Sequence, residues 1–174
     1  MTDPFKIEFE DDIVLVLKAF IKKTKQVSPT LWTLFPLLGK VFEKNKQTFG
    51  NLLDTINSYL LSGNQYLAAN KQLLQLVIEW ANMSLFSKEP NITIQNSEGA
   101  ILFQLLFQVY KGTTVLDEYF ELILEKILER MQALPMADHL KRHLLGVFLS
   151  ATSYNPTVAI TYMEKKGITG EVIS

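Results

Sequence analysis

Two histidines of this sequence stand at a spacing that suits metal chemistry. His139 and His143 are one helical turn apart, so their imidazoles could share a metal ion from one face of a helix. Lys141 and Arg142 lie between them and would repel a cation, and the glutamate of the zinc-protease motif is missing. We therefore predict ordinary helix histidines and no metal site.

Other residue types that carry catalysis are missing or are not suitably arranged. The chain has no cysteine, which excludes disulfides, thiol nucleophiles and cysteine metal ligands. It also has no serine nucleophile elbow, no glycine-rich phosphate loop and no pair of carboxylates set apart in a polar pocket. We expect no enzyme activity and no cofactor.

The most suggestive polar pattern is a set of four glutamates, which we name the acidic stripe: Glu118, Glu121, Glu125 and Glu129. Steps of three and four residues place them on one helix face, where like charges cost about 0.2–0.5 kcal/mol per pair. A basic partner would relieve this repulsion, so the acidic stripe is a candidate contact for a basic protein. The alternative is a solvated face whose charge is screened by Lys126 and Arg130.

A helical hairpin would carry the acidic stripe. Its first arm, residues 97–111, is apolar on most sides, as in a buried helix. Its second arm, residues 116–131, has apolar residues at steps of three and four, with the acidic stripe on the other face. Gly112 would end the first arm, and Thr114 with Asp117 has the spacing of a capping box for the second. Such a hairpin cannot cover its own apolar surface, so it must stack on similar neighbours.

Apolar periodicity and capping residues predict six further helices. Ser28 and Pro29 would open one of them as N-cap and first-turn proline, and residues 86–96 would form the one long loop. The approximate helix ranges are about 8–25, 28–42, 48–63, 65–85, 138–154 and 155–167.

Eight helices with short turns and no strand pattern give four hairpins. Their first helices start near residues 8, 48, 97 and 137, at steps of roughly 40, 49 and 40, close to the period of about 40–47 for HEAT and armadillo repeats. We therefore predict an all-α fold, an α-α superhelix of the HEAT or armadillo type. Residues 1–174 would be a single segment of a larger repeat protein, and a closed helical bundle is the alternative.

A solenoid cut on both sides would leave the apolar faces of its end repeats without caps. We expect such faces at Phe9 and Ile13 near one end and at Tyr162 and Met163 near the other. They would be unusually exposed, or would be covered by self-association.

Residues 27–37, Val-Ser-Pro-Thr-Leu-Trp-Thr-Leu-Phe-Pro-Leu, resemble a helix in the C-terminal half of the importin-β (karyopherin-β) superfamily. That helix has the pattern VSP, an aromatic residue and L-x-P, and the match is closest to the importin seven and eight branch. The same order and similar spacing are followed by Phe42, the third helix with Tyr59, the Lys111-Gly112 turn with residues 116–128, and residues 140–154 with Asn155-Pro156. The resemblance covers most of the chain, but these positions are helix caps and core residues.

The resemblance implies a HEAT-repeat nuclear transport receptor of the cytoplasm and nucleus. The full-length receptor would carry basic protein cargo, such as ribosomal proteins or histones, past FG nucleoporins under control of the Ran GTPase. Grooves between helices would take the phenylalanine-glycine repeats. The chain differs from a full receptor because it is much shorter and lacks both the N-terminal Ran-binding repeats and the long acidic loop of this branch. The alternative is a generic HEAT scaffold that binds proteins but has no transport role.

Composition agrees with a folded protein of this kind. With 174 residues, 48% of them hydrophobic, the chain can bury a substantial core. A formal net charge of -1 gives no long-range attraction to nucleic acid or to anionic membranes. Residues 1–12 lack the features of a secretory signal, and no apolar run reaches the roughly 18 residues that cross a bilayer. We expect a soluble intracellular protein without nucleic-acid or membrane partners.

Overall fold

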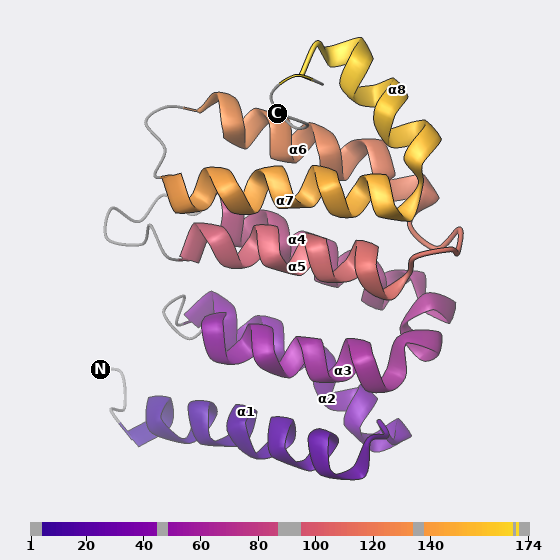
Figure 1. Ribbon diagram of the computed structural model, residues 1–174. Coiled ribbons are helices and arrows are strands. Elements are labelled where there is room, and N and C mark those ends of the chain that lie inside the picture. Colours follow the sequence, from indigo (N-terminus) through magenta and orange to yellow (C-terminus); the bar gives the residue numbers. More distant parts are fainter. Residues whose placement is uncertain (1–4, 45–48, 87–94, 134–137, 169, 171–174) are drawn as a thin grey trace. The chain divides into compact units, whose positions relative to one another are not determined.

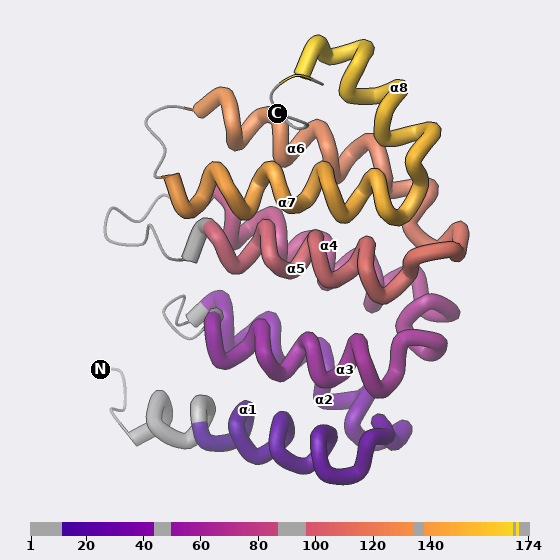
Figure 2. Tube along the Cα trace, viewed as in Figure 1, coloured from indigo at the N-terminus to yellow at the C-terminus, as the bar shows by residue number. Residues whose placement is uncertain are grey.

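The computed structural model describes residues 5–44, 49–86, 95–133, 138–168 and 170, and most of their side chains from Asp12 onward. These residues form eight α-helices, one short 3-10 helix and no strand (Figures 1 and 2). The predicted all-α fold of helical hairpins is therefore confirmed. None of the described helices is long and apolar enough to span a membrane. The elements are α1 (Phe5–Thr24), α2 (Pro29–Lys44), α3 (Phe49–Ala69), α4 (Lys71–Leu85), α5 (Gln95–Val109), η2 (Asp117–Tyr119), α6 (Phe120–Gln132), α7 (Asp138–Tyr154) and α8 (Pro156–Lys166).

The helices belong to two compact units, Met1–Trp80 and Ala81–Ser174. The first unit holds α1, α2, α3 and most of α4. The second holds the end of α4 and helices α5 to α8. Each unit buries its own set of large apolar side chains, as the 3.6-residue period of the sequence predicts.

In the first unit, α1 and α3 lie side by side (Figure 1). Val14, Leu17 and Ile21 on α1 are buried, at steps of three and four residues. Polar groups also connect the two helices. The Thr55 hydroxyl donates to the Val14 carbonyl oxygen at 3.3 Å, and Lys18 forms an ion pair with Asp54.

An aromatic cluster joins α2 to α3 and α4 within the first unit. The ring of Phe35 lies 4.8 Å from that of Tyr59 and 5.3 Å from that of Trp80, measured between centroids. All three side chains are buried. The Tyr59 hydroxyl donates to the Leu31 carbonyl oxygen at 2.8 Å, which satisfies the polar end of a buried ring.

The predicted break at Gly63 is present as a kink inside α3, where Gly63 has non-helical angles (φ -145°, ψ 26°). A second break, which the sequence did not predict, separates α3 from α4 at Asn70. The Oδ1 of Asn70 accepts a hydrogen bond from the backbone N–H of Leu73 at 3.2 Å. Asparagine is a strong N-cap residue, so it can start a new helix after a single non-helical position.

In the second unit, α5 and α7 lie side by side (Figure 1). The Gln104 side chain of α5 donates to the His143 carbonyl oxygen of α7 at 2.8 Å. The predicted helix end at Gly112 is confirmed, and α8 is capped at both ends. Gly112 and Gly167 have left-handed φ values of 76° and 71°, and the Asn155 side chain accepts from the N–H of Val158 at 3.3 Å to start α8.

The predicted capping box of Thr114 and Asp117 does not form. η2 intervenes, so α6 starts only at Phe120, and neither element has a side-chain cap. The carboxylate of Asp117 instead accepts a hydrogen bond from the Tyr154 hydroxyl at 2.8 Å. That hydroxyl also accepts from the N–H of Leu116 at 3.0 Å. A long-range partner therefore replaces the local cap.

The predicted exposure of apolar residues near the two ends of the chain is found at one end and not at the other. Ile13 is 57% exposed, as expected, whereas Tyr162 and Met163 are buried. The prediction for those two residues is wrong because they are covered within the second unit, where Tyr162 faces residues of α6. The side chain of Phe9 and most of the predicted 86–96 loop lie outside the described residues.

Candidate functional site

The acidic stripe lies on two elements of the second unit. Glu121, Glu125 and Glu129 are on α6, whereas Glu118 is on the preceding 3-10 turn, η2. All four side chains are exposed. The turn has a tighter winding than an α-helix, so only the three glutamates of α6 share the regular spacing that the sequence indicated.

Two carboxylates of the acidic stripe already have lysine partners within the chain. The ammonium group of Lys126 lies 2.8 Å from Glu129, and that of Lys166 lies 3.4 Å from Glu125. Both pairs are exposed, and pairs of this kind contribute at most about 1 kcal/mol. The guanidinium of Arg130 donates to the carbonyl oxygens of Leu85 and Ala133.

The glutamates of α6 form one wall of a groove whose other wall is α8. The groove has two hollows, of about 190 Å³ and about 220 Å³, and Tyr162 lines both. Hereafter we call this the α6–α8 groove. Its lining residues are Glu121, Glu125, Leu128, Glu129, Gln132, Thr157, Val158, Thr161, Tyr162, Lys165 and Lys166.

Tyr162 is the polar centre of the α6–α8 groove. Its hydroxyl oxygen is buried and has no hydrogen-bond partner among the described residues. Burial raises the pKa of Tyr162 to about 12, and the negative charges of Glu125 and Glu121 add to the rise. The Lys166 ammonium lies 5.5 Å from the ring centroid. The groove therefore combines carboxylates, a neutral hydroxyl and two lysines, and its chemistry is mixed rather than purely acidic.

Sequence reasoning missed the α8 wall of this groove. Tyr162 occupies an apolar position of its helix, and Lys165 and Lys166 stand in the last turn, where basic residues favour the helix dipole anyway. Nothing in their spacing shows that they face the glutamates of α6. Their role follows from how α8 packs, which local patterns do not encode.

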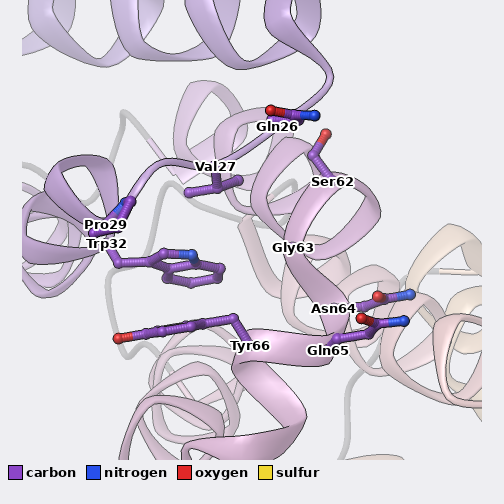
Figure 3. Close-up of a pocket in the computed structure, with 9 residues that line it drawn as sticks. All are labelled: Gln26, Val27, Pro29, Trp32, Ser62, Gly63, Asn64, Gln65 and Tyr66. Atoms are coloured by element: carbon purple, nitrogen blue, oxygen red, sulfur yellow. The ribbon is translucent and has the colours of Figure 1, made fainter.

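The first unit contains a larger cavity, of about 480 Å³, between the α1–α2 turn and the Gly63 kink of α3 (Figure 3). The rings of Trp32 and Tyr66 stack beside it, with centroids 4.6 Å apart and an interplanar angle of 22°. The sequence gave a partial signal for this site, because Gly63 interrupts a helical pattern near two aromatic positions. The lining residues are Gln26, Val27, Pro29, Trp32, Ser62, Gly63, Asn64, Gln65 and Tyr66.

Both histidines, His139 and His143, lie on α7. His143 is half-buried, and its carbonyl oxygen accepts from Gln104. Among the residues that the structure describes, no three histidine, aspartate or glutamate side chains are grouped to hold a metal ion.

Comparison with known proteins gives similarity to importins over most of the chain. The chain is 20% identical over 163 residues to the probable importin-7 homolog of Dictyostelium discoideum. It is 22% identical over 160 residues to human importin-8 and 24% identical over 161 residues to importin-8 of Danio rerio. Each match covers 90–91% of this chain but 15% of the relative.

These similarities support the resemblance to the importin-β family that the sequence indicated. The chain spans only about 15% of the length of the importins it matches. No protein-family model matches it. No solved structure matches it either.

Proposed function

We propose that this chain is a segment of a nuclear transport receptor and contributes to the binding of basic protein cargo. The observation that carries the proposal is the similarity over nine-tenths of the chain to importins of an amoeba, a fish and a human. The all-α fold of helical hairpins agrees with it. The segment would belong to the C-terminal half of a receptor of the importin seven and eight branch, and would act by binding rather than by catalysis.

The α6–α8 groove is the proposed contact for cargo. An arginine or lysine of the cargo would approach the exposed carboxylates of Glu121, Glu125 and Glu129 on α6. Lys166 competes for Glu125, so the cargo must displace an existing ion pair. Binding to this segment should therefore be weak and strongly dependent on salt.

A binding titration tests this assignment. We expect a lysine- and arginine-rich peptide to bind the E121Q/E125Q/E129Q variant roughly tenfold more weakly than the wild type at low salt, because each exposed pair contributes at most about 1 kcal/mol. The difference should shrink at physiological salt, where charges are screened beyond about 8 Å. The measurement is isothermal titration calorimetry at both salt concentrations.

A matched variant controls for net charge. E43Q/E79Q/E164Q also removes three exposed carboxylates, none of which lines the α6–α8 groove. It should bind within about twofold of the wild type, since the lost charges lie outside the proposed contact. Equal affinities of the wild type and the groove variant at low salt would exclude the groove as the cargo contact.

The full-length parent protein would separate a transport receptor from a scaffold without a transport role. In the proposed receptor, Ran and FG nucleoporins are partners of the whole protein, which moves between cytoplasm and nucleus. The parent should support nuclear accumulation of a basic cargo in permeabilised cells supplied with Ran and GTP. A parent that binds the cargo but leaves it outside the nucleus would favour the generic HEAT scaffold.

A further inference from the structure

The cavity beside Trp32 and Tyr66 is a preformed concave site that the proposed cargo contact does not use. Its volume of about 480 Å³ lies within the range of about 300–1,000 Å³ that is usual for ligand pockets. Gly63 shapes it by close approach, because a Cβ at this position would lie 2.5 Å from the Trp32 ring and 3.3 Å from Val27. A larger residue at the kink would therefore push against the ring.

The lining has the chemistry of a site for uncharged polypeptide. None of its nine residues carries a charge, so the cavity offers no counter-ion for a charged ligand. Gln26, Asn64 and Gln65 have amide side chains, which both donate and accept hydrogen bonds and so match the groups of a peptide backbone. Figure 3 shows these amides and the Ser62 hydroxyl around the cavity, with the stacked Trp32 and Tyr66 rings beside them.

The two rings provide a partly open aromatic surface and an indole donor. Tyr66 is 49% exposed, so it offers ring surface to a ligand in addition to the surface that stacks on Trp32. The Trp32 side chain lines the cavity and is 5% exposed, and its indole N–H is a hydrogen-bond donor. A donor beside an aromatic surface is the arrangement with which proteins bind proline rings and the neighbouring backbone carbonyl oxygens.

We propose that this cavity binds an extended, uncharged peptide segment that contains proline. A proline ring would lie on the exposed surface of Tyr66, and backbone carbonyl oxygens would accept from the Trp32 indole N–H and from the glutamine side chains. The proline-rich conformation loses little entropy on binding because it is already extended in solution. The cavity shares no residue with the α6–α8 groove, so peptide binding here does not depend on whether the groove binds basic cargo.

Nuclear magnetic resonance of the two indole N–H groups tests the proposal. The probe is an acetylated and amidated decaproline, added to the ¹⁵N-labelled chain. The Trp32 signal should shift on titration, whereas that of Trp80, which is 4% exposed and does not line the cavity, should stay in place. The variant W32F identifies the Trp32 signal by its loss. Equal shifts of both signals, or no shift at millimolar peptide, would overturn the proposal.

Substitutions around the cavity make the test specific. Y66A and Y66L should each weaken decaproline binding at least tenfold, and two variants are used so that a folding defect in one does not decide the result. The control L61A removes a side chain of the same helix that is 65% exposed and lies outside the lining, and it should bind like the wild type. Circular dichroism confirms that each variant is helical. Unchanged binding by a folded Tyr66 variant would contradict the assignment.

A second peptide tests the ligand class. A decapeptide of alternating glycine and serine is also uncharged but has no ring and no preformed extended conformation. It should bind at least tenfold more weakly than decaproline. Equal affinity for the two peptides would show that the cavity does not recognise proline and would overturn the proposal.

Discussion

Two polar side chains of the second unit, one buried and one half-buried, show how single residues set local order. The Tyr154 hydroxyl donates to Asp117 and accepts from the N–H of Leu116, so both of its hydrogen-bonding roles are filled. Glu98 is the opposite case, because its Oε2 is buried without a partner among the described residues. Burial raises the pKa of Glu98 to about 7. An unpaired carboxyl of this kind favours the protonated, neutral form.

The raised pKa of Glu98 predicts a pH-dependent stability. The folded state holds the proton up to a pH of about 7, whereas an unfolded glutamate loses it near 4.5. The protonated Glu98 carboxyl therefore contributes fully to the free energy of unfolding below pH 4.5, and this contribution is lost as the pH rises through about 7. In urea unfolding, the free energy of unfolding of the wild type should fall between pH 5 and about pH 8. It should fall less in E98Q, because glutamine does not titrate.

The exposed Glu79 supplies the control for this prediction. E79Q removes a carboxylate from α4 whose side chain is open to solvent. It should leave the pH profile of unfolding as in the wild type. Parallel profiles for E98Q and the wild type would show that Glu98 does not titrate in this range.

At the scale of elements, the chain turns between helices mainly through capping residues. Ser28 Oγ accepts from the N–H of Leu31 at 3.4 Å where α2 begins, and Asn155 does the same for Val158 at the start of α8. Asn70 is the unexpected member of this group, because it alone separates α3 from α4. A single side chain therefore decides where one helix stops and the next begins.

Removal of the Asn70 cap should destabilise the chain. N70A leaves the backbone N–H of Leu73 without its side-chain acceptor, and we expect a loss of about 1 kcal/mol in the free energy of unfolding. Thermal unfolding should shift downward by about 2–4 °C. The control N51A changes an exposed asparagine inside α3 and should have little effect or a slightly stabilising one. A wild-type melting temperature for N70A would show that the cap is dispensable.

At the scale of the whole molecule, α1 has a second apolar face that nothing in the first unit covers. The residues of this face follow helical spacing and are 54–68% exposed: Ile13, Val16 and Phe20. They lie beside the face formed by Val14, Leu17 and Ile21, which is buried. A helix that is apolar over so much of its circumference normally has partners on more than one side.

The open face of α1 predicts self-association in solution. The wild-type chain should form dimers or larger species as its concentration rises, whereas I13S/V16S/F20S should remain monomeric, because three adjacent apolar side chains are removed from water in the complex. Sedimentation equilibrium measures both. The control L61S/L122S/L149S changes three exposed leucines on different helices and should associate like the wild type. A strictly monomeric wild type at high concentration would refute this prediction.

The sequence by itself determined the helices and most of their ends, because these depend on neighbours in the chain. The range 138–154 for α7, the N-caps Ser28 and Asn155 and the left-handed Gly112 and Gly167 follow from periodicity and local backbone chemistry. The order of core and capping residues also indicated the importin resemblance, which the relatives support. Each of these features forms between residues a few positions apart.

Only the tertiary structure decided which distant side chains meet. The Tyr154 hydroxyl donates to the carboxylate of Asp117, 37 residues away, where the spacing had predicted a local cap. Lys166 comes within 3.4 Å of Glu125 across 41 residues, which turns an acidic stripe into one wall of a mixed groove. Likewise the Gly63 kink brings Tyr66 onto Trp32. Such pairings depend on how whole helices pack, because burial and electrostatic energies are gained only when the elements are in place.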